Sequence, residues 1–212
     1  SKNTLRIGYS DPHGLPLINK VLVKIKDNFE NLIPSFVFDQ TDTNLGRLVH
    51  GQTDIVVGIK DSKFKDDSID FKQLRSVGFV VAFPKNHPLV KMAKRKKLTE
   101  ISQEVLWDYT QVVQIPPYLL KNVFSKGSHI LPVNDKLNNI ICSFAPEVYA
   151  LVKAGFGFAF VPEYLALPDK NLVFYPFKET HHAPFGIYYR KESLEAEDSA
   201  VARFLEKAGE IV

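Results

Sequence analysis

Apolar stretches of two kinds alternate along the first sixty residues of the chain. Residues 5–10 form a short continuous apolar run, and apolar side chains then recur at helical spacing through residues 15–32. A second run at 35–40, a helical pattern at 41–50 and a third run at 54–59 repeat this succession. Strands that alternate with helices at this spacing predict βαβ units, and therefore a parallel sheet covered by helices.

The alternation continues toward the C-terminus, with one strand that is longer than the rest. Residues 74–83 exceed the average strand of about 5–6 residues, which is long enough to run from one subdomain into another. The further predicted strands are residues 110–115, 138–143, 156–162, 172–177 and 185–190. The further predicted helices are residues 98–106, 117–124, 144–154 and 199–211. The whole pattern predicts an α/β fold.

Composition fits a globular protein that folds without covalent or metal cross-links. The chain has 212 residues, of which 45% are hydrophobic and 24% charged, enough to bury a core as one domain or two lobes. No apolar run approaches the roughly 20 residues of a membrane-spanning helix, and the first residues carry no apolar signal segment. We therefore expect no membrane partner. The single cysteine, Cys142, excludes an internal disulfide and favours a cytoplasmic location.

One segment is densely basic although the net charge of the chain is only +3. Five of the seven residues from 91 to 97 are Lys or Arg. Neither interleaved aromatic residues nor a DNA-reading motif accompanies them, so we expect a solvated surface loop rather than a nucleic-acid site.

The motifs of common catalytic and cofactor sites are absent. The glycines of "GFGF", residues 155–158, follow a predicted helix and precede a strand, which is the reverse of a dinucleotide-binding turn. His181 and His182 are adjacent and lack a third imidazole, so a surface turn is favoured over a metal site. His87 has no partner for a catalytic triad, which favours a structural role. The sequence predicts no catalytic residue, metal or cofactor.

The order of five segments nevertheless resembles a known family. They are "LRIGYS", "TDTNLGRLVHGQTDIVVGI", "VVAFPKNHPL", "EVYALVKAGFGFAFVPEYLA" and "FGIYYRK". In this order and spacing they resemble the effector-binding domain of LysR-type transcriptional regulators over nearly all of the chain. The resemblance implies the fold of type 2 periplasmic binding proteins, in which two Rossmann-like α/β lobes are joined by two crossing strands and hold a small ligand between them.

The resemblance also implies a division of the chain. Subdomain I is expected at residues 1–82 and 182–212, and subdomain II at 83–181. Family members carry a winged helix-turn-helix before this domain, whereas this sequence begins at the first strand of the sensing domain. We therefore expect this chain to sense an effector, with DNA bound only through the missing N-terminal domain.

Junctions between strands and helices supply the candidate effector-binding residues. In parallel α/β sheets, ligands lie where strands end and helices begin. Ser10 and Thr41 follow the first two strands, and their family counterparts face the effector. Ser143 and Phe144 open a later helix and would approach from the opposite lobe. Hydroxyl and N–H groups at helix starts favour a small anionic or polar effector, although Ser10 is equally suited to cap the helix at 15–32.

Further candidates lie beside these junctions or at other strand ends. Asp11 is either an effector contact or a helix cap. Gln114 could donate and accept hydrogen bonds. Lys60 could neutralise a carboxylate if it points inward, but an exposed lysine is the commoner state. The remaining candidates are Ile59, Pro116 and Tyr118.

The leading hypothesis is a regulatory sensor for a small-molecule effector, organic-acid or amino-acid-like, that signals through a homodimer, or a tetramer in the full-length protein. By resemblance, the dimer would pair the helix at 15–32 with the helix at 147–154. Two alternatives remain open at this stage. A solute-binding protein of the same fold would need an export signal upstream, and a dehydratase-like enzyme would need a general acid or base, for which Asp11 is the one candidate placed at a strand end.

Overall fold

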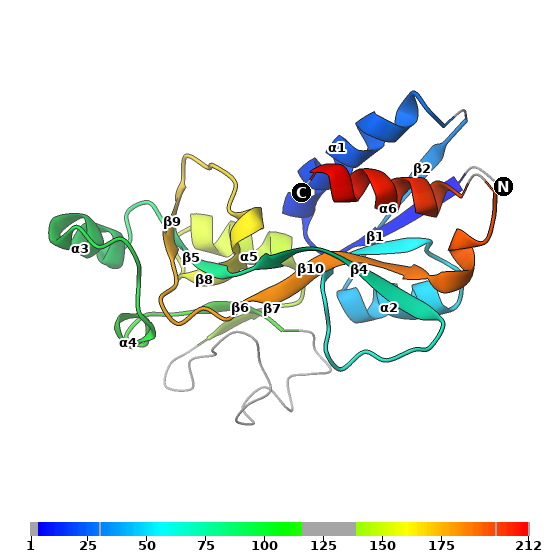
Figure 1. Ribbon diagram of the computed structural model, residues 1–212. Helices are drawn as coiled ribbons and strands as arrows, with labels where there is room; N and C mark the ends of the chain where they lie inside the picture. The colour runs from blue at the N-terminus through cyan, green and yellow to red at the C-terminus, as the bar shows by residue number, and fades with distance from the viewer. Residues whose placement is uncertain (1–3, 30, 116–138, 198, 212) are drawn as a thin grey trace. The chain divides into compact units, whose positions relative to one another are not determined.

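A computed structural model describes residues 4–29, 31–115, 139–197 and 199–211 (Figure 1). The chain divides into two compact units. Unit 1 comprises Ser1–Ser76 and Ala183–Val212, and unit 2 comprises Val77–His182. The chain is therefore α/β throughout, and each unit has its own sheet and its own helices.

Unit 1 is built on a five-stranded sheet with the order β2-β1-β3-β10-β4. Strand β1 pairs in parallel with both β2 and β3, and β10 pairs with β3 in the antiparallel direction. The predicted parallel sheet thus exists, with the returning β10 as an antiparallel addition. The strands are β1 (Thr4–Tyr9), β2 (Ile33–Phe38), β3 (Ile55–Ile59), β4 (Ile69–Val77) and β10 (Ala183–Arg190).

Helices cover both faces of this sheet. Helices α1 (Leu15–Lys26) and α6 (Ala200–Ile211) pack side by side, and α2 (Thr41–Val49) packs against β1, β3 and β10 (Figure 1). A 3₁₀ turn, η1 (Pro12–Gly14), precedes α1, and a second, η4 (Lys191–Leu194), precedes α6. The predicted helix at 15–32 is too long, because α1 ends at Lys26.

Unit 2 has a smaller sheet with the order β8-β5-β9 and a separate parallel pair, β6 and β7. The amide of Val112 donates to the carbonyl of Phe158 over 2.8 Å and links the pair to the segment that leads into β8. The elements of unit 2 are β5 (Phe79–Pro84), α3 (Pro88–Lys96), α4 (Gln103–Leu106), β6 (Val112–Gln114), β7 (Ile140–Cys142), α5 (Ala145–Lys153), β8 (Ala159–Pro162), the 3₁₀ turn η3 (Glu163–Leu165) and β9 (Leu172–Pro176).

The single long strand predicted at 74–83 is two strands, β4 and β5, that are separated at Gly78. The predicted subdomain boundary at residue 82 falls inside β5. Because β5 pairs with β8 on one side and β9 on the other, the residues from Val77 onward belong with unit 2.

The prediction of a loop at 91–97 is wrong, because residues 91–96 belong to α3 and Lys97 is its C-cap. Leu89, Val90 and Ala93 are buried on one side of this helix, in a core with Phe83 and Phe158. Burial of this apolar face explains why a strongly charged segment is helical.

Candidate functional site

The carboxyl edge of the unit 1 sheet brings together the two hydroxyl groups that the sequence singled out. Ser10 follows β1 and Thr41 is the first residue of α2, and the Thr41 hydroxyl donates a hydrogen bond to the Ser10 Oγ over 3.1 Å. Both residues are half-buried. The N-cap of α2 is Gln40, and its side chain does not accept a hydrogen bond from the amides in the first turn of α2. The paired hydroxyls therefore lie at the positive end of a helix dipole.

A residue that the sequence reasoning missed holds this edge together. Asn44 is completely buried, and its Nδ2 lies 3.2 Å from the carbonyl oxygens of both Tyr9 and Val37. These carbonyls belong to the ends of β1 and β2. Arg47 donates to the Asn44 Oδ1 over 3.3 Å and forms an ion pair with Asp39 at 2.7 Å. Because Asn44 is on the same helix as Thr41, it fixes the position of Thr41 relative to both strands.

Asp11 serves as a cap. Its Oδ1 accepts a hydrogen bond from the amide of His13 over 2.9 Å, and the His13 Nδ1 lies 3.3 Å from the same oxygen. Asp11 caps the short 3₁₀ turn η1 and not α1. The N-cap of α1 is Gly14, and no side chain caps that helix. The expected cap by Ser10 or Asp11 on the helix that begins at Leu15 is therefore wrong in this detail.

Ile59 and Lys60 lie at the end of β3, on the same sheet edge as Ser10. Ile59 is half-buried and Lys60 is exposed. The Lys60 ammonium lies 5.4 Å from the centre of the Phe71 ring, a cation–π contact within unit 1. This arrangement is the exposed alternative that the sequence left open for Lys60.

In unit 2, the start of α5 is already occupied by a carboxylate. Gln114 is exposed at the end of β6, and Ser143 and Phe144 lie between β7 and α5. The Glu147 Oε2 accepts hydrogen bonds from the amides of Ser143 over 2.9 Å and Phe144 over 3.1 Å. Phe144 is the N-cap of α5, and the Glu147 carboxylate reaches back to its amide. An anion could bind these amides only by displacing Glu147.

Two predicted site residues, Pro116 and Tyr118, lie outside the described residues. Among the residues that the structure does describe, no group of three or more His, Cys, Asp or Glu side chains is arranged to hold a metal ion. Within the same residues, no helix is both long and apolar enough to cross a bilayer.

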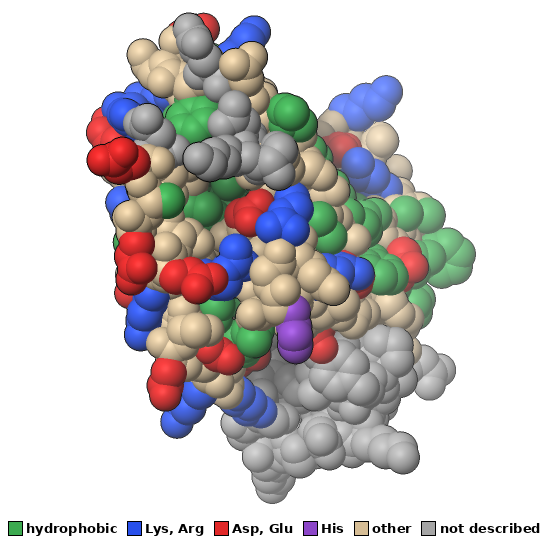
Figure 2. Space-filling model, turned by 90° about the vertical axis from the view of Figure 1, so that its right-hand side faces the viewer, with side chains coloured by type: hydrophobic (Ala, Val, Ile, Leu, Met, Phe, Trp, Pro, Cys, Tyr) green, Lys and Arg blue, Asp and Glu red, His purple; other side chains and the backbone are tan. Residues whose placement is uncertain are grey.

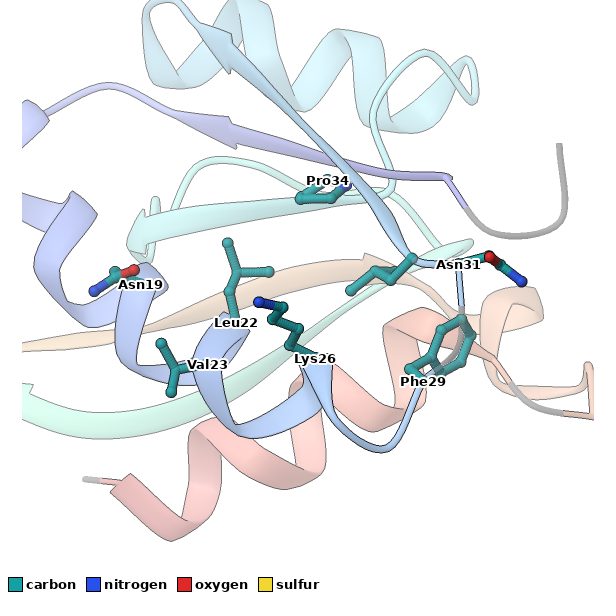
Figure 3. A pocket seen from close by; sticks show the side chains of 8 residues that line it. Asn19, Leu22, Val23, Lys26, Phe29, Asn31 and Pro34 are labelled. Atoms are coloured by element: carbon teal, nitrogen blue, oxygen red, sulfur yellow. The ribbon is translucent and has the colours of Figure 1, made fainter.

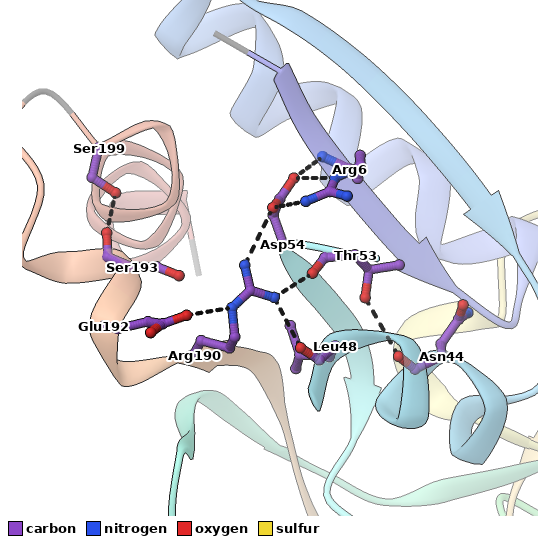
Figure 4. A network of polar contacts seen from close by, with 9 residues as sticks. All are labelled: Arg6, Asn44, Leu48, Thr53, Asp54, Arg190, Glu192, Ser193 and Ser199. Carbon is purple, nitrogen blue, oxygen red and sulfur yellow. Dashed lines mark hydrogen bonds and ion pairs between the residues drawn. The ribbon is translucent and has the colours of Figure 1, made fainter. Parts of the chain in front are cut away.

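A separate ionic network lies at the amino end of β3 (Figure 4). The Asp54 carboxylate accepts hydrogen bonds from the Arg6 side chain at 2.8 and 3.0 Å, and Arg190 lies 3.5 Å away. Burial acts to raise the pKa of Asp54, but the hydrogen bonds from Arg6 and the charges of both arginines outweigh it and lower the pKa. Arg190 also donates to the carbonyls of Leu48 and Thr53. The network therefore joins β1, β3, β10 and α2.

Comparison with known proteins identifies the family. Residues 1–210 match the family described as the LysR substrate binding domain. The chain belongs to this family. The predicted fold class is therefore confirmed, and the prediction of a LysR-type effector-binding domain is favoured over the two alternatives. Among curated protein sequences, none is significantly similar to this LysR substrate binding domain.

Several solved structures share the fold. The BenM effector binding domain with its effector benzoate has a TM-score of 0.69 and 22% identity, over 98% of this chain and 91% of that chain. The reduced OxyR regulatory domain from Pseudomonas aeruginosa has a TM-score of 0.72 and 14% identity, over 97% of each chain. The regulatory domain of MetR, a LysR family regulator from N. meningitidis, has a TM-score of 0.67 and 15% identity, over 98% of this chain and 93% of that chain.

Proposed function

We propose that this LysR substrate binding domain binds a small organic-acid or amino-acid-like effector at the carboxyl edge of the unit 1 sheet. The observation that carries the proposal is the hydroxyl pair of Ser10 and Thr41 at the start of α2. The two hydroxyls can donate to a carboxylate and accept from an ammonium or hydroxyl group, and the helix start favours negative charge. In unit 2, Gln114, Ser143 and Phe144 stay predictions from the sequence, and the amides of Ser143 and Phe144 already donate to Glu147.

The test is a thermal-shift screen of metabolites against the 212-residue chain. A ligand present at about 100 times its Kd should stabilise the domain by about 2.7 kcal/mol. Ser10→Ala and Thr41→Val should each weaken binding by roughly fivefold to tenfold, because each removes a hydrogen bond worth about 1 kcal/mol. Ser35→Ala is the control, since Ser35 is an exposed serine on β2 away from the strand ends. Stabilisation that is undiminished in both site variants at the same ligand concentration would contradict the placement of the site.

The domain would act as a sensor within a larger cytoplasmic regulator, not as an enzyme. The match to a full-length BenM mutant covers 98% of this chain but 67% of that chain, so the larger protein contains residues beyond such a domain. An effector shifts a conformational equilibrium only when its affinity differs between the two states. We propose that the shift is passed to a DNA-binding domain of the parent protein.

An exposed apolar surface on unit 1 supports association of two copies. The three side chains that form it, here called the α1–β2 surface, are between 40% and 61% exposed: Val23, Phe36 and Phe38. β2 is an edge strand, so its outer side has no strand partner in the sheet. A groove of about 480 Å³ between α1 and β2 continues this surface, with the apolar Leu22, Val23 and Pro34 and the polar Asn19, Lys26 and Asn31 among its lining (Figure 3). Apolar edge strands of this kind are usually covered.

The occupant proposed for the α1–β2 surface is a second copy of the chain, in which α5 packs against α1. On α5 and just after it, Ala150, Ala154 and Phe156 are exposed, and Phe156 is 58% exposed. On the face seen in Figure 2, side chains of both charges are interspersed, and hydrophobic side chains gather along one edge of the view. Apolar contact areas that are bounded by mixed charges are typical of protein interfaces.

Sedimentation velocity tests the dimer. The chain is expected to sediment as a dimer at high micromolar concentration, and Val23→Arg should shift it to a monomer because the charge would be buried against apolar atoms. Leu194→Arg is the matched control, since Leu194 is 44% exposed on η4, outside the α1–β2 surface. A wild-type monomer, or equal dissociation by both substitutions, would contradict the proposed interface.

A further inference from the structure

A cationic surface on α3 takes no part in the effector site or in the proposed dimer. Five exposed residues, here called the α3 cations, form it: Lys91, Lys94, Arg95, Lys96 and Lys97. They make up five of the 27 lysines and arginines of the chain within seven consecutive positions.

Helix α3 is anchored in the core of unit 2, so the positions of these charges are fixed relative to that core. Leu89, Val90 and Ala93 anchor one side of α3 in the core of unit 2, and His87 caps its start by accepting from the Leu89 amide over 3.2 Å. At 3.6 residues per turn, Lys91 and Arg95 lie one turn apart on the side opposite the anchor. The cations therefore project from a rigid helix into solvent.

The α3 cations also have no neutralising partner among the residues that the structure describes. Other surface cations have carboxylate partners, for example Lys24 with Glu210 at 3.6 Å and Lys153 with Asp169 at 2.6 Å. Within the described parts of the chain, none of the α3 cations has a carboxylate at ion-pairing distance. The acidic Glu100 that follows α3 is exposed and takes part in no such pair there.

Helix stability accounts for only part of this charge. Lys94, Arg95 and Lys96 lie in the last turn, where cations interact favourably with the helix dipole. Lys91 lies in the first half of the helix, where a cation gains nothing from the dipole. A polyanionic partner accounts for all five charges.

We propose that the α3 cations contact the phosphate backbone of duplex DNA, without sequence specificity. The choice of DNA rests on the proposed role as part of a transcription regulator, whereas the cationic surface itself does not depend on the effector. Neutralised phosphates release counterions, so such a contact weakens steeply with salt, with a slope of log K against log salt of about −0.9 per phosphate.

The test is fluorescence anisotropy of a short mixed-sequence DNA duplex titrated with the 212-residue chain, from about 50 to about 200 mM KCl. The triple variant Lys91→Gln, Lys94→Gln, Arg95→Gln should bind at least tenfold more weakly at the lower salt, and its salt slope should fall by about 2–3. The matched control, Lys63→Gln, Lys65→Gln, Arg75→Gln, removes the same charge from exposed positions of unit 1 and should bind like wild type.

Equal losses in both triple variants would show that net charge alone governs binding, and would overturn the proposal. Absence of DNA binding by wild type, or binding only to phosphatidylserine vesicles in a parallel titration, would overturn it as well. Thermal shift by the effector is measured on the same variants. Retained effector binding with lost DNA binding in the α3 triple variant would uphold both proposals. Retained DNA binding in that variant would overturn the DNA proposal, whereas absence of any effector-induced shift in wild type would count against the effector site alone.

Discussion

Replacement of Asn44 by alanine is expected to lower the free energy of unfolding of the domain by about 3 kcal/mol. The Asn44 amide lies in a completely buried position and serves carbonyl oxygens at the ends of β1 and β2. Removal of the amide takes this donor from both carbonyls in a site that water does not reach, although the Tyr9 carbonyl still accepts from the Asp39 amide over 3.1 Å. A buried group that is left unsatisfied costs about 1–3 kcal/mol. The loss should also misplace Thr41, and so weaken the effector binding proposed here.

Urea denaturation at neutral pH measures the loss. Thr43→Ala is the matched control, because Thr43 is exposed on the same helix, one residue away. We expect this control to stay within about 0.5 kcal/mol of wild type, as surface substitutions usually do. If the Asn44 and Thr43 variants were equally stable, Asn44 would not be the residue that joins the two strands.

Acidification is expected to destabilise unit 2 through His87. Its imidazole is 7% exposed and lies between the rings of Phe83, at 4.9 Å, and Tyr109, at 4.8 Å. Burial lowers the pKa of His87 from 6.5 to about 4. Protonation of His87 is therefore less favourable in the folded state than in the unfolded chain. The contribution of His87 to the free energy of unfolding is full above about pH 6.5 and is lost as the pH falls toward 4. The whole effect approaches about 3 kcal/mol.

Urea denaturation at a series of pH values between about 7.5 and 4.5 isolates this contribution. In His87→Asn, the side chain keeps an oxygen that can cap α3 but cannot titrate, so the stability of this variant should fall less steeply with acid than that of wild type. His181→Asn, at an exposed position, should keep the wild-type slope. Identical slopes for wild type and His87→Asn would mean that another group governs acid sensitivity.

The order of strands and helices was predictable because each carries a clear apolar period. The predicted bounds of the helix at 15–32 and the predicted loop at 91–97 are wrong because the apolar spacing in these segments does not follow the secondary structure. Phe29 and Leu32 continue the helical spacing beyond Lys26, but they line the groove between α1 and β2, and the backbone at Asn31 has a φ of 62°, which ends any helix. In α3, the apolar face has only three buried members among many charges, so the sequence alone favours a loop.

The meeting of Ser10 and Thr41 was predictable in outline, because parallel neighbours such as β1 and β2 end at the same sheet edge. The roles of Asn44 and Glu147 were not predicted, since polar residues within helices usually face solvent. Two signals were present nonetheless. Asn44 stands four residues before the buried Leu48 on the apolar face of α2, and Glu147 stands three residues after the N-cap of α5, the position from which a glutamate reaches back.

The most direct test of the effector site is a two-dimensional amide NMR titration of the chain with the ligand that emerges from the thermal-shift screen. At saturation, the largest shift changes are expected at Ser10 and Thr41 and at their neighbours along the carboxyl edge of the unit 1 sheet. At a ligand concentration near the wild-type Kd, Thr41→Val should reduce these changes several-fold, because its binding is expected to be roughly fivefold to tenfold weaker. Changes confined to the α1–β2 surface, or unaltered in Thr41→Val, would contradict the site.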